Sequence, residues 1–180
     1  MTNLPKESAL PPVLSCNYQS DITYPGQKHF DCGNPVIDKF VRTSLKKSVR
    51  NSDCAAKALI DSNNGELIGI CTFTAYSLEK QRVSGVLQGS QPSEIGVVRL
   101  VMLGVARKYQ KQGYGQDLLC DFFEHVKIIH QALPIKGVYL DADPAAINFY
   151  VRLGFVQLSD TPNAFGAVPM FLAIQHIIAA

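Results

Sequence analysis

Residues 95–105 read IGVVRLVMLGV, a nearly unbroken apolar run rich in valine. A strand that is buried on both faces has this pattern, whereas a strand with one wet face alternates apolar and polar residues. We therefore predict a central strand covered on both sides.

A glycine loop, YQKQGYG (109–115), follows this strand directly and leads into an amphipathic helix expected over about residues 114–131. The first N–H groups of a helix attract anions, and Gly113 and Gly115 carry no Cβ that would block a ligand. The patterns GxGxxG and GxxxxGK[ST] are absent, which argues against a dinucleotide site and a P-loop. These residues alone leave a phosphate cradle and a plain strand-to-helix turn equally open.

The other segments predict an α/β chain with a mixed sheet. A helix is expected over 35–50, with Asn34 as N-cap and Pro35 as its first residue. A hairpin turn at Asn64-Gly65 joins two strands, and Asp143 caps a short helix that Gly154 ends. The expected strands are 54–61, 66–74, 135–141, 155–158 and 168–178, the short helix is 145–153, and 77–94 is a long polar loop.

Length and composition indicate a single folded domain, which we expect at 23–180, preceded by an extended arm at 1–22 that includes an edge strand. The net charge of +2 excludes nucleic-acid binding by the whole surface, so such a role needs a local patch. No apolar run is long enough for a membrane span and no signal-peptide layout is present, so we expect a cytoplasmic protein without a membrane partner. Five cysteines without CxxC and four scattered histidines predict reduced thiols and no metal site.

Two stretches resemble motifs of the GCN5-related N-acetyltransferase (GNAT) superfamily. LGVARKYQKQGYG resembles the acetyl-CoA loop, and AAINFYVRLGF resembles the helix and strand that follow it in the family. The resemblance implies a GNAT fold, with a twisted mixed sheet of six or seven strands, about four flanking helices, and central strands splayed to admit acetyl-CoA. It also implies that acetyl-CoA is the cosubstrate and that no metal takes part.

The resemblance assigns roles to particular positions. Backbone groups of Leu103, Gly104 and Val105 would pair with the pantetheine arm, and a backbone N–H there would bind the oxyanion. Tyr150 would give a proton to the departing thiolate, although its position beside Phe149 alone would favour a core aromatic residue. The remaining residues expected to bind the cosubstrate are Gln110, Lys111, Gln112, Gly113, Tyr114, Gly115 and Asn148.

Residues 29–51, HFDCGNPVIDKFVRTSLKKSVRN, resemble the start of the toxin–antitoxin branch of the superfamily, which acetylates the α-amino group of aminoacyl-tRNA. Cations on one helix face could track an RNA backbone, and a solvated face is an equal alternative. No acidic residue lies between Glu94 and Asp117, which favours an α-amine because its pKa of about 7.7–8.0 leaves a neutral fraction without a base. Glu94 and Glu79 are the other candidate bases. The cations are Lys39, Arg42, Lys46, Lys47 and Arg50.

The chain departs from that branch at Met102, Ala106 and Asp143, where arginine, aspartate and asparagine are common. Two alternatives therefore stay open. The protein acetylates a small metabolite or peptide amine, or it is a GNAT-fold antitoxin or partner protein whose role is protein binding. A small toxin or antitoxin protein encoded nearby is the expected partner, and a homodimer is also open. Nucleophilic catalysis by Cys120 with His125 is disfavoured, because Cys120 is flanked by the apolar stripe of the helix expected over about residues 114–131.

Overall fold

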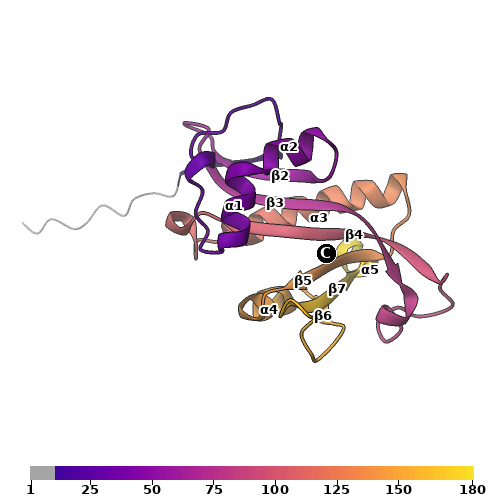
Figure 1. Cartoon of the computed structure of the whole chain (residues 1–180). Helices are drawn as coiled ribbons and strands as arrows, with labels where there is room; N and C mark the ends of the chain where they lie inside the picture. Colours follow the sequence, from indigo (N-terminus) through magenta and orange to yellow (C-terminus); the bar gives the residue numbers. More distant parts are fainter. Residues whose placement is uncertain (1–10) are drawn as a thin grey trace, which may run out of the picture.

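A single seven-stranded mixed sheet organises the chain (Figure 1). The structure, a computed structural model, describes residues 11–180, so the first ten residues of the expected arm lie outside it. The strands follow the order β1-β2-β3-β4-β5-β7-β6, and only β4 and β5 are parallel. They are β1 (Val13–Asn17), β2 (Ala55–Asp61), β3 (Leu67–Glu79), β4 (Glu94–Val105), β5 (Gly137–Ala142), β6 (Val156–Gln157) and β7 (Val168–Ala173).

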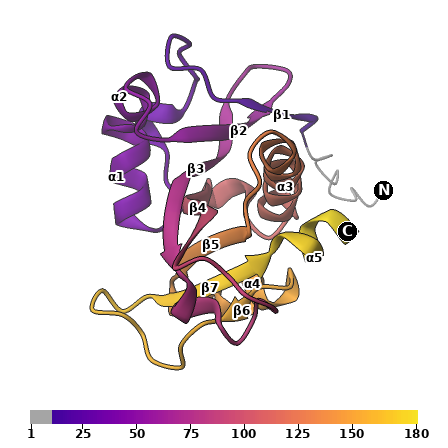
Figure 2. The same cartoon turned by 90° about the vertical axis from the view of Figure 1, so that its right-hand side faces the viewer.

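Helices cover both faces of the sheet. In Figure 2, α1 and α2 lie on one side, and α3 and α5 lie on the other. The described residues form five α-helices where about four were expected: α1 (Pro35–Thr43), α2 (Leu45–Arg50), α3 (Tyr114–Ala132), α4 (Ile147–Arg152) and α5 (Ile174–Ala179). Short 3-10 helices are η1 (Gln27–His29), η2 (Lys80–Val83), η3 (Arg107–Tyr109) and η4 (Pro144–Ala146).

The sheet separates the apolar cores. On the α3 face, Leu118 and Phe122 pack onto β4 and β5 through Val98 and Val138. Beneath α1 and α2, Val41 and Leu45 form a second core together with Tyr18, Tyr24, Phe30, Ala56, Ala58, Leu67, Ile70 and Ala106. β4 is buried on both faces at Val97, Val98 and Leu100, as its composition predicts, but Val101 beyond them is 44% exposed. The α/β class with a mixed sheet is confirmed.

The first helix begins where expected but divides in two. The Asn34 side chain accepts hydrogen bonds from the N–H groups of Val36 and Ile37, which confirms it as the N-cap. The single helix expected over 35–50 is wrong at Ser44, which separates α1 from α2. The Thr43 hydroxyl donates to the Lys39 carbonyl at 2.7 Å, and such back-bonding bends helices.

The expected loop at 77–94 is shorter than predicted. β3 continues to Glu79 and β4 starts at Glu94, so the two strands pair up to Glu79↔Glu94. Leu78 and Ile95 are buried there against Val83 of η2, which is why these polar-looking segments form strands. Only residues 80–93 connect them.

The C-terminal prediction is wrong beyond Ala173. Residues 168–178 were expected to form one strand, but β7 ends opposite Gly137, where β5 begins. Without a partner strand the chain turns into α5, whose Ile174 and Ile177 lie three residues apart and enter the α3-side core. The hydrophobic pattern of residues 168–178 could not distinguish one long strand from a strand followed by a helix, because a short apolar run fits both.

Candidate active site

The two parallel strands separate soon after they meet. β4 and β5 pair only at Val98↔Val138 and Arg99↔Tyr139, and Figure 1 shows them diverging beyond that point. A bulge against β3 leaves Val101 of β4 without a partner residue, because Thr72 pairs with Met102 and Phe73 with Leu100. The expected splay of the central strands is therefore present.

A cleft of about 730 Å³ fills the gap between the separated strands. One wall is residues 101–105 of β4, and the other is residues 141–146, from the end of β5 into η4. A second cavity of about 570 Å³ adjoins it and shares Val105 and Gln110 with it. Its walls come from the glycine loop and α4, so the two cavities form one path past the end of β4.

The glycine loop presents unpaired backbone donors. Lys111 and Gly113 adopt left-handed conformations, with φ of 61° and 90°, and α3 starts directly after Gly113. Within residues 11–180, the N–H groups of residues 111–115 donate to no protein acceptor. Gly115 borders the second cavity, and a Cβ there would approach Val105 and Phe149 at 3.8 and 3.9 Å. The loop thus has the open backbone donors that an anion site needs, and its role as a phosphate cradle remains a prediction.

Two of the residues predicted to bind the cosubstrate, Gln110 and Gly104, also hold the structure around the loop together. The Gln110 amide donates to the carbonyls of Cys32 and Val105, at 2.7 and 2.8 Å, and so ties the loop to the segment before α1. Gly104 has to be small, because a Cβ there would lie 3.0 Å from Ile37 and 3.2 Å from the Cys32 sulfur. Leu103, Gly104 and Val105 all line the main cleft.

Residues 31–38 fold into a turn that seats α1 beside the cleft. Gly33 is left-handed, with φ of 91°, and the buried Asp38 carboxylate accepts from the Cys32 N–H at 2.7 Å. Arg107 at the start of η3 donates to the Asp31 carboxylate at 2.9 Å. The CGNP motif therefore seats α1 against the end of β4 through its backbone and through the Asn34 side-chain cap.

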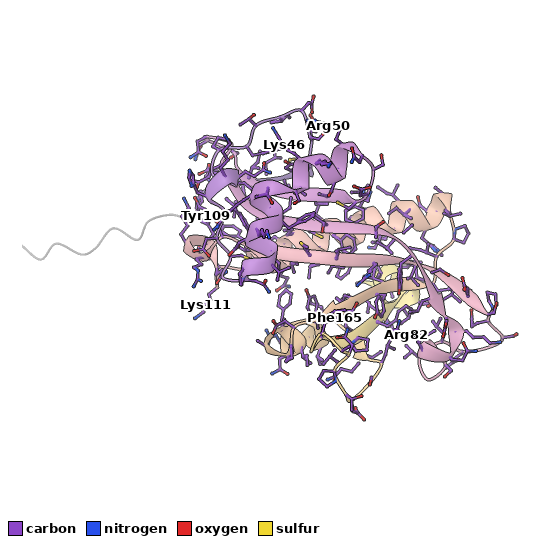
Figure 3. All side chains as sticks on the ribbon, viewed as in Figure 1. Lys46, Arg50, Arg82, Tyr109, Lys111 and Phe165 are labelled. Carbon is purple, nitrogen blue, oxygen red and sulfur yellow. The ribbon has the colours of Figure 1, made fainter. Side chains whose placement is uncertain are left out.

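The cations of the first helices are free of carboxylates. Among the described residues, none of the five predicted cations on α1 and α2 forms a salt bridge, and Figure 3 shows Lys46 and Arg50 on this outer side. Lys39, Lys47 and Arg50 are exposed. Arg42 is partly engaged, because its Nε donates to the Phe30 carbonyl at 2.6 Å. Lys46 reaches Thr23 at only 3.5 Å.

Tyr150 projects from α4 into the main cleft. Its side chain is 9% exposed, and its ring packs edge-on against Phe149 and Phe155. Burial, and to a smaller extent the nearby Cys71 thiol, raises the pKa of Tyr150 well above its usual value. The phenol therefore stays protonated at physiological pH and is available as a proton donor. Gln112 and Asn148 are exposed and line neither cavity, so their binding roles remain predictions.

Comparison with known proteins decides the family. A family model described as an acetyltransferase (GNAT) domain matches residues 56–157, which is more than half of the chain. The chain belongs to the GNAT acetyltransferase family. The matched region runs from β2 to β6 and contains the splayed strands, the glycine loop and Tyr150.

Three individual proteins to which the chain is similar carry names that mention a toxin or a tRNA. A tRNA-acetylating toxin of Mycobacterium tuberculosis (strain ATCC 25618 / H37Rv) is 23% identical over 128 residues, covering 70% of this chain and 75% of the relative. A crystal structure described as a bacterial toxin is 93% identical, with a TM-score of 0.93 and coverage of 94% and 95%. The AtaT structure with acetyl-methionyl-tRNAfMet is 23% identical, with a TM-score of 0.79 and coverage of 93% and 98%.

Neither glutamate considered as a base borders the GNAT cleft. Glu94 and Glu79 face each other at the far end of the β3–β4 hairpin, and the Glu94 carboxylate accepts from Ser77 at 2.6 Å. Val101 lies seven residues further along β4, a distance of roughly 20 Å in an extended strand. The position of Glu94 and Glu79 therefore gives no support to the general-base role for which they were the other candidates.

Sequence reasoning missed one acidic residue, Asp141, which lines the cleft from the end of β5. One carboxylate oxygen accepts from Arg99 at 2.9 Å, and the other accepts from Tyr139 at 2.8 Å and from Asn163 at 3.2 Å. Arg99 is the last β4 residue paired with β5, so this ion pair closes the point at which the strands separate. Its position at the carboxyl end of a buried parallel strand was a usable signal.

The described residues leave three other features to consider: a metal site, a membrane-spanning helix and a Cys120–His125 pair. Residues 11–180 contain no group of three His, Cys, Asp or Glu side chains arranged to hold a metal ion. Over the same range, no helix is both long and apolar enough to cross a bilayer. Cys120 is exposed on α3, and His125 packs against Phe73 on that helix's inner side.

Proposed function

We propose that this GNAT protein transfers the acetyl group of acetyl-CoA to the α-amino group of aminoacyl-tRNA, as a toxin of a toxin–antitoxin pair. The names of its relatives support this: a tRNA-acetylating toxin, a bacterial toxin and AtaT, whose structure contains an acetylated aminoacyl-tRNA. A tyrosine-to-phenylalanine mutant of AtaT has also been solved with acetyl-CoA and the C-terminus of the antitoxin AtaR.

The observation that carries the proposal is the combination of the cleft and glycine loop with a separate row of cations, which lies on α1 and α2 outside the cleft lining. The unpaired N–H groups of residues 111–115 lie at the start of α3, where a pyrophosphate would be held. The five cations, none of which forms a salt bridge among the described residues, lie on α1 and α2, on the opposite face of the sheet (Figure 2). A small amine would need no such row of cations, whereas an RNA acceptor does.

The reaction follows from the groups present. The neutral amine attacks the thioester carbonyl carbon, a C–N bond forms, and the C–S bond breaks. Tyr150 gives its proton to the departing thiolate, and the proton that the amine loses restores the phenol through solvent. A backbone N–H on the cleft wall at 103–105 would bind the oxyanion, as preorganised donors do.

The pH profile should show one ascending limb. An α-amine with a pKa of about 7.7–8.0 becomes neutral as pH rises, so the rate at low acceptor concentration should increase and level off above about pH 8. Tyr150 works in its protonated form, and its raised pKa keeps it protonated below about pH 10. Short initial-rate assays from pH 6 to 9.5 measure this. A descending limb below pH 9 that vanishes in Tyr150→Phe would contradict it.

Removing the exposed cations should weaken tRNA binding and its salt dependence together. A Lys39→Gln, Lys47→Gln and Arg50→Gln variant should raise KM for charged tRNA at least about 10-fold. Its slope of log KM against log salt should fall by about 2–3, because each lost phosphate contact accounts for about 0.7–0.9. Lys136→Gln is the control, since Lys136 is exposed just before β5, away from the cleft. Equal salt slopes in all three proteins would count against a phosphate-binding face.

The direct assay incubates the purified protein with labelled acetyl-CoA and charged tRNA. Label should become acid-precipitable with charged tRNA and not with the same tRNA after deacylation. Peptide and metabolite amines, tested in parallel, should be poor acceptors. Transfer to a small amine with no transfer to charged tRNA would replace the proposal with the metabolite alternative.

A small antitoxin protein is the partner that we propose, by analogy with AtaT, whose structure has been solved with the C-terminus of the antitoxin AtaR. A tRNA substrate places the proposed activity in the cytoplasm. The division between an arm at 1–22 and a domain at 23–180 remains a proposal, and β1 within that arm pairs with β2 as an edge strand. A homodimer also remains a prediction.

A further inference from the structure

Phe165 is an aromatic side chain that packs on almost nothing. Its side chain is 95% exposed, and it sits in the connection between β6 and β7, at the rim of the main cleft (Figure 3). Figure 2 shows this connection projecting on the same side of the sheet as α1 and α2. One exposed apolar residue means little by itself. Its place at the mouth of the cleft, on the side of the unpaired cations, is what makes it informative.

The segment that carries Phe165 is held in shape by one residue, Asn163. The Asn163 side-chain oxygen accepts from the N–H groups of Phe165 and Ala167, at 2.9 and 3.1 Å. Its backbone N–H donates to the Ala167 carbonyl at 2.7 Å, and its carbonyl accepts from Gly166 at 2.9 Å. The ring therefore projects from a hydrogen-bonded turn, and little backbone freedom is lost when a ligand meets it.

The turn is also anchored to the point where the central strands part. The Asn163 amide donates to Asp141 at 3.2 Å, and the same carboxylate pairs with Arg99 of β4. Tyr139 donates to Asp141, and Arg82 of η2 donates in turn to the Tyr139 hydroxyl at 2.8 Å. The position of Phe165 is thus fixed relative to the cleft through Asp141.

We propose that Phe165 is the stacking platform for the terminal nucleobase of the aminoacyl-tRNA, an inference that rests on the proposed function. The amine has to reach the interior of the cleft near Tyr150, so the ribose and base that follow the ester lie towards the rim. Every base offers a flat face to an aromatic ring, and such stacking is a common source of affinity for unpaired nucleotides. All tRNAs end in adenosine, so the contact would be independent of the amino acid.

The test compares variants of the full chain at position 165 on charged tRNAs that the wild type accepts. With saturating acetyl-CoA, Phe165→Ala and Phe165→Leu should each raise KM for charged tRNA about 5-fold to 150-fold, the range of one lost stacking contact. Phe165→Trp should restore it, because that side chain keeps a ring. KM for acetyl-CoA should not change. The melting temperature should also stay the same, because the ring packs on nearly nothing. Ile128→Ala is a matched control, since Ile128 is 61% exposed on α3, away from the cleft.

The results of these assays test the stacking role of Phe165 separately from the proposed function. Wild-type KM in Phe165→Ala, or full rescue by the ringless Phe165→Leu, overturns the stacking role. A penalty confined to tRNAs charged with large apolar amino acids also overturns it, because the ring would then read the amino-acid side chain. Equal penalties across tRNAs charged with small and large amino acids support it. Failure of the wild-type protein to acetylate any charged tRNA refutes the proposed function itself and is visible before any variant is made.

Discussion

Tyr150→Phe is expected to lower kcat by about 10²-fold to 10⁴-fold, the usual contribution of a positioned general acid. The phenyl ring keeps the packing against Phe149 and Phe155, so the variant removes only the hydroxyl. The thiolate must then leave without a proton donor, while both substrates bind as before. Single-turnover rates with labelled acetyl-CoA measure the loss, and equilibrium binding of acetyl-CoA should stay within about 2-fold.

The stability of that variant serves as its control. The Tyr150 hydroxyl makes no hydrogen bond within residues 11–180, so its removal leaves no described partner unsatisfied. The melting temperature should therefore not fall. A Tyr150→Phe protein with wild-type kcat would show that another group protonates the thiolate.

Gly115→Val is expected to weaken acetyl-CoA binding at least about 100-fold. The side chain would occupy the second cavity beside Val105 and Phe149, where the unpaired N–H groups would hold a pyrophosphate. The fold should persist, because the Cβ contacts at 3.8 and 3.9 Å are ordinary van der Waals distances and the Gly115 backbone is not left-handed. Gly113 is the poorer test, since its φ of 90° would strain any side chain.

Two matched proteins complete this experiment. Gly115→Ala adds one methyl group and should cause a smaller loss of affinity. Gly96→Val introduces the same side chain at the other end of β4, where nothing lies within 4 Å of the new Cβ, and should bind normally. Calorimetric titration with acetyl-CoA compares them. Normal affinity in Gly115→Val would refute the loop as the pyrophosphate site.

Local patterns were enough for those parts of the fold that depend on neighbouring residues. Asn34 caps α1, Gly65 turns the β2–β3 hairpin and Gly154 ends α4, each with the backbone conformation that its residue type predicts. The buried run 95–105 and the stripe of α3 have lengths and periods that fit only one element type. The glycine loop and Tyr150 could be found because both lie in continuous motifs.

Features that depend on distant residues could not be predicted. The strand at 168–178 stops where its partner β5 starts, which only the register reveals. Arg99 and Asp141 are 42 positions apart, and their ion pair forms because the parallel strands part beside them. Phe165 is an ordinary loop residue until Asn163 and Asp141 bring it to the rim of the cleft. The cosubstrate side of the site could therefore be predicted from continuous motifs, whereas on the acceptor side only the cations of α1 and α2 could be predicted and Phe165 could not.

The chemical identity of the product tests the central claim most directly. Charged tRNA is incubated with the protein and acetyl-CoA and digested with nuclease, and the 3′-terminal aminoacyl-adenosine is then analysed by mass spectrometry. The proposed function predicts one added acetyl group on the α-amino nitrogen, with none on the ribose or the base, and far less of this product in a Tyr150→Phe reaction stopped at the same early time. An unmodified aminoacyl-adenosine in the presence of active, acetyl-CoA-binding protein would contradict it.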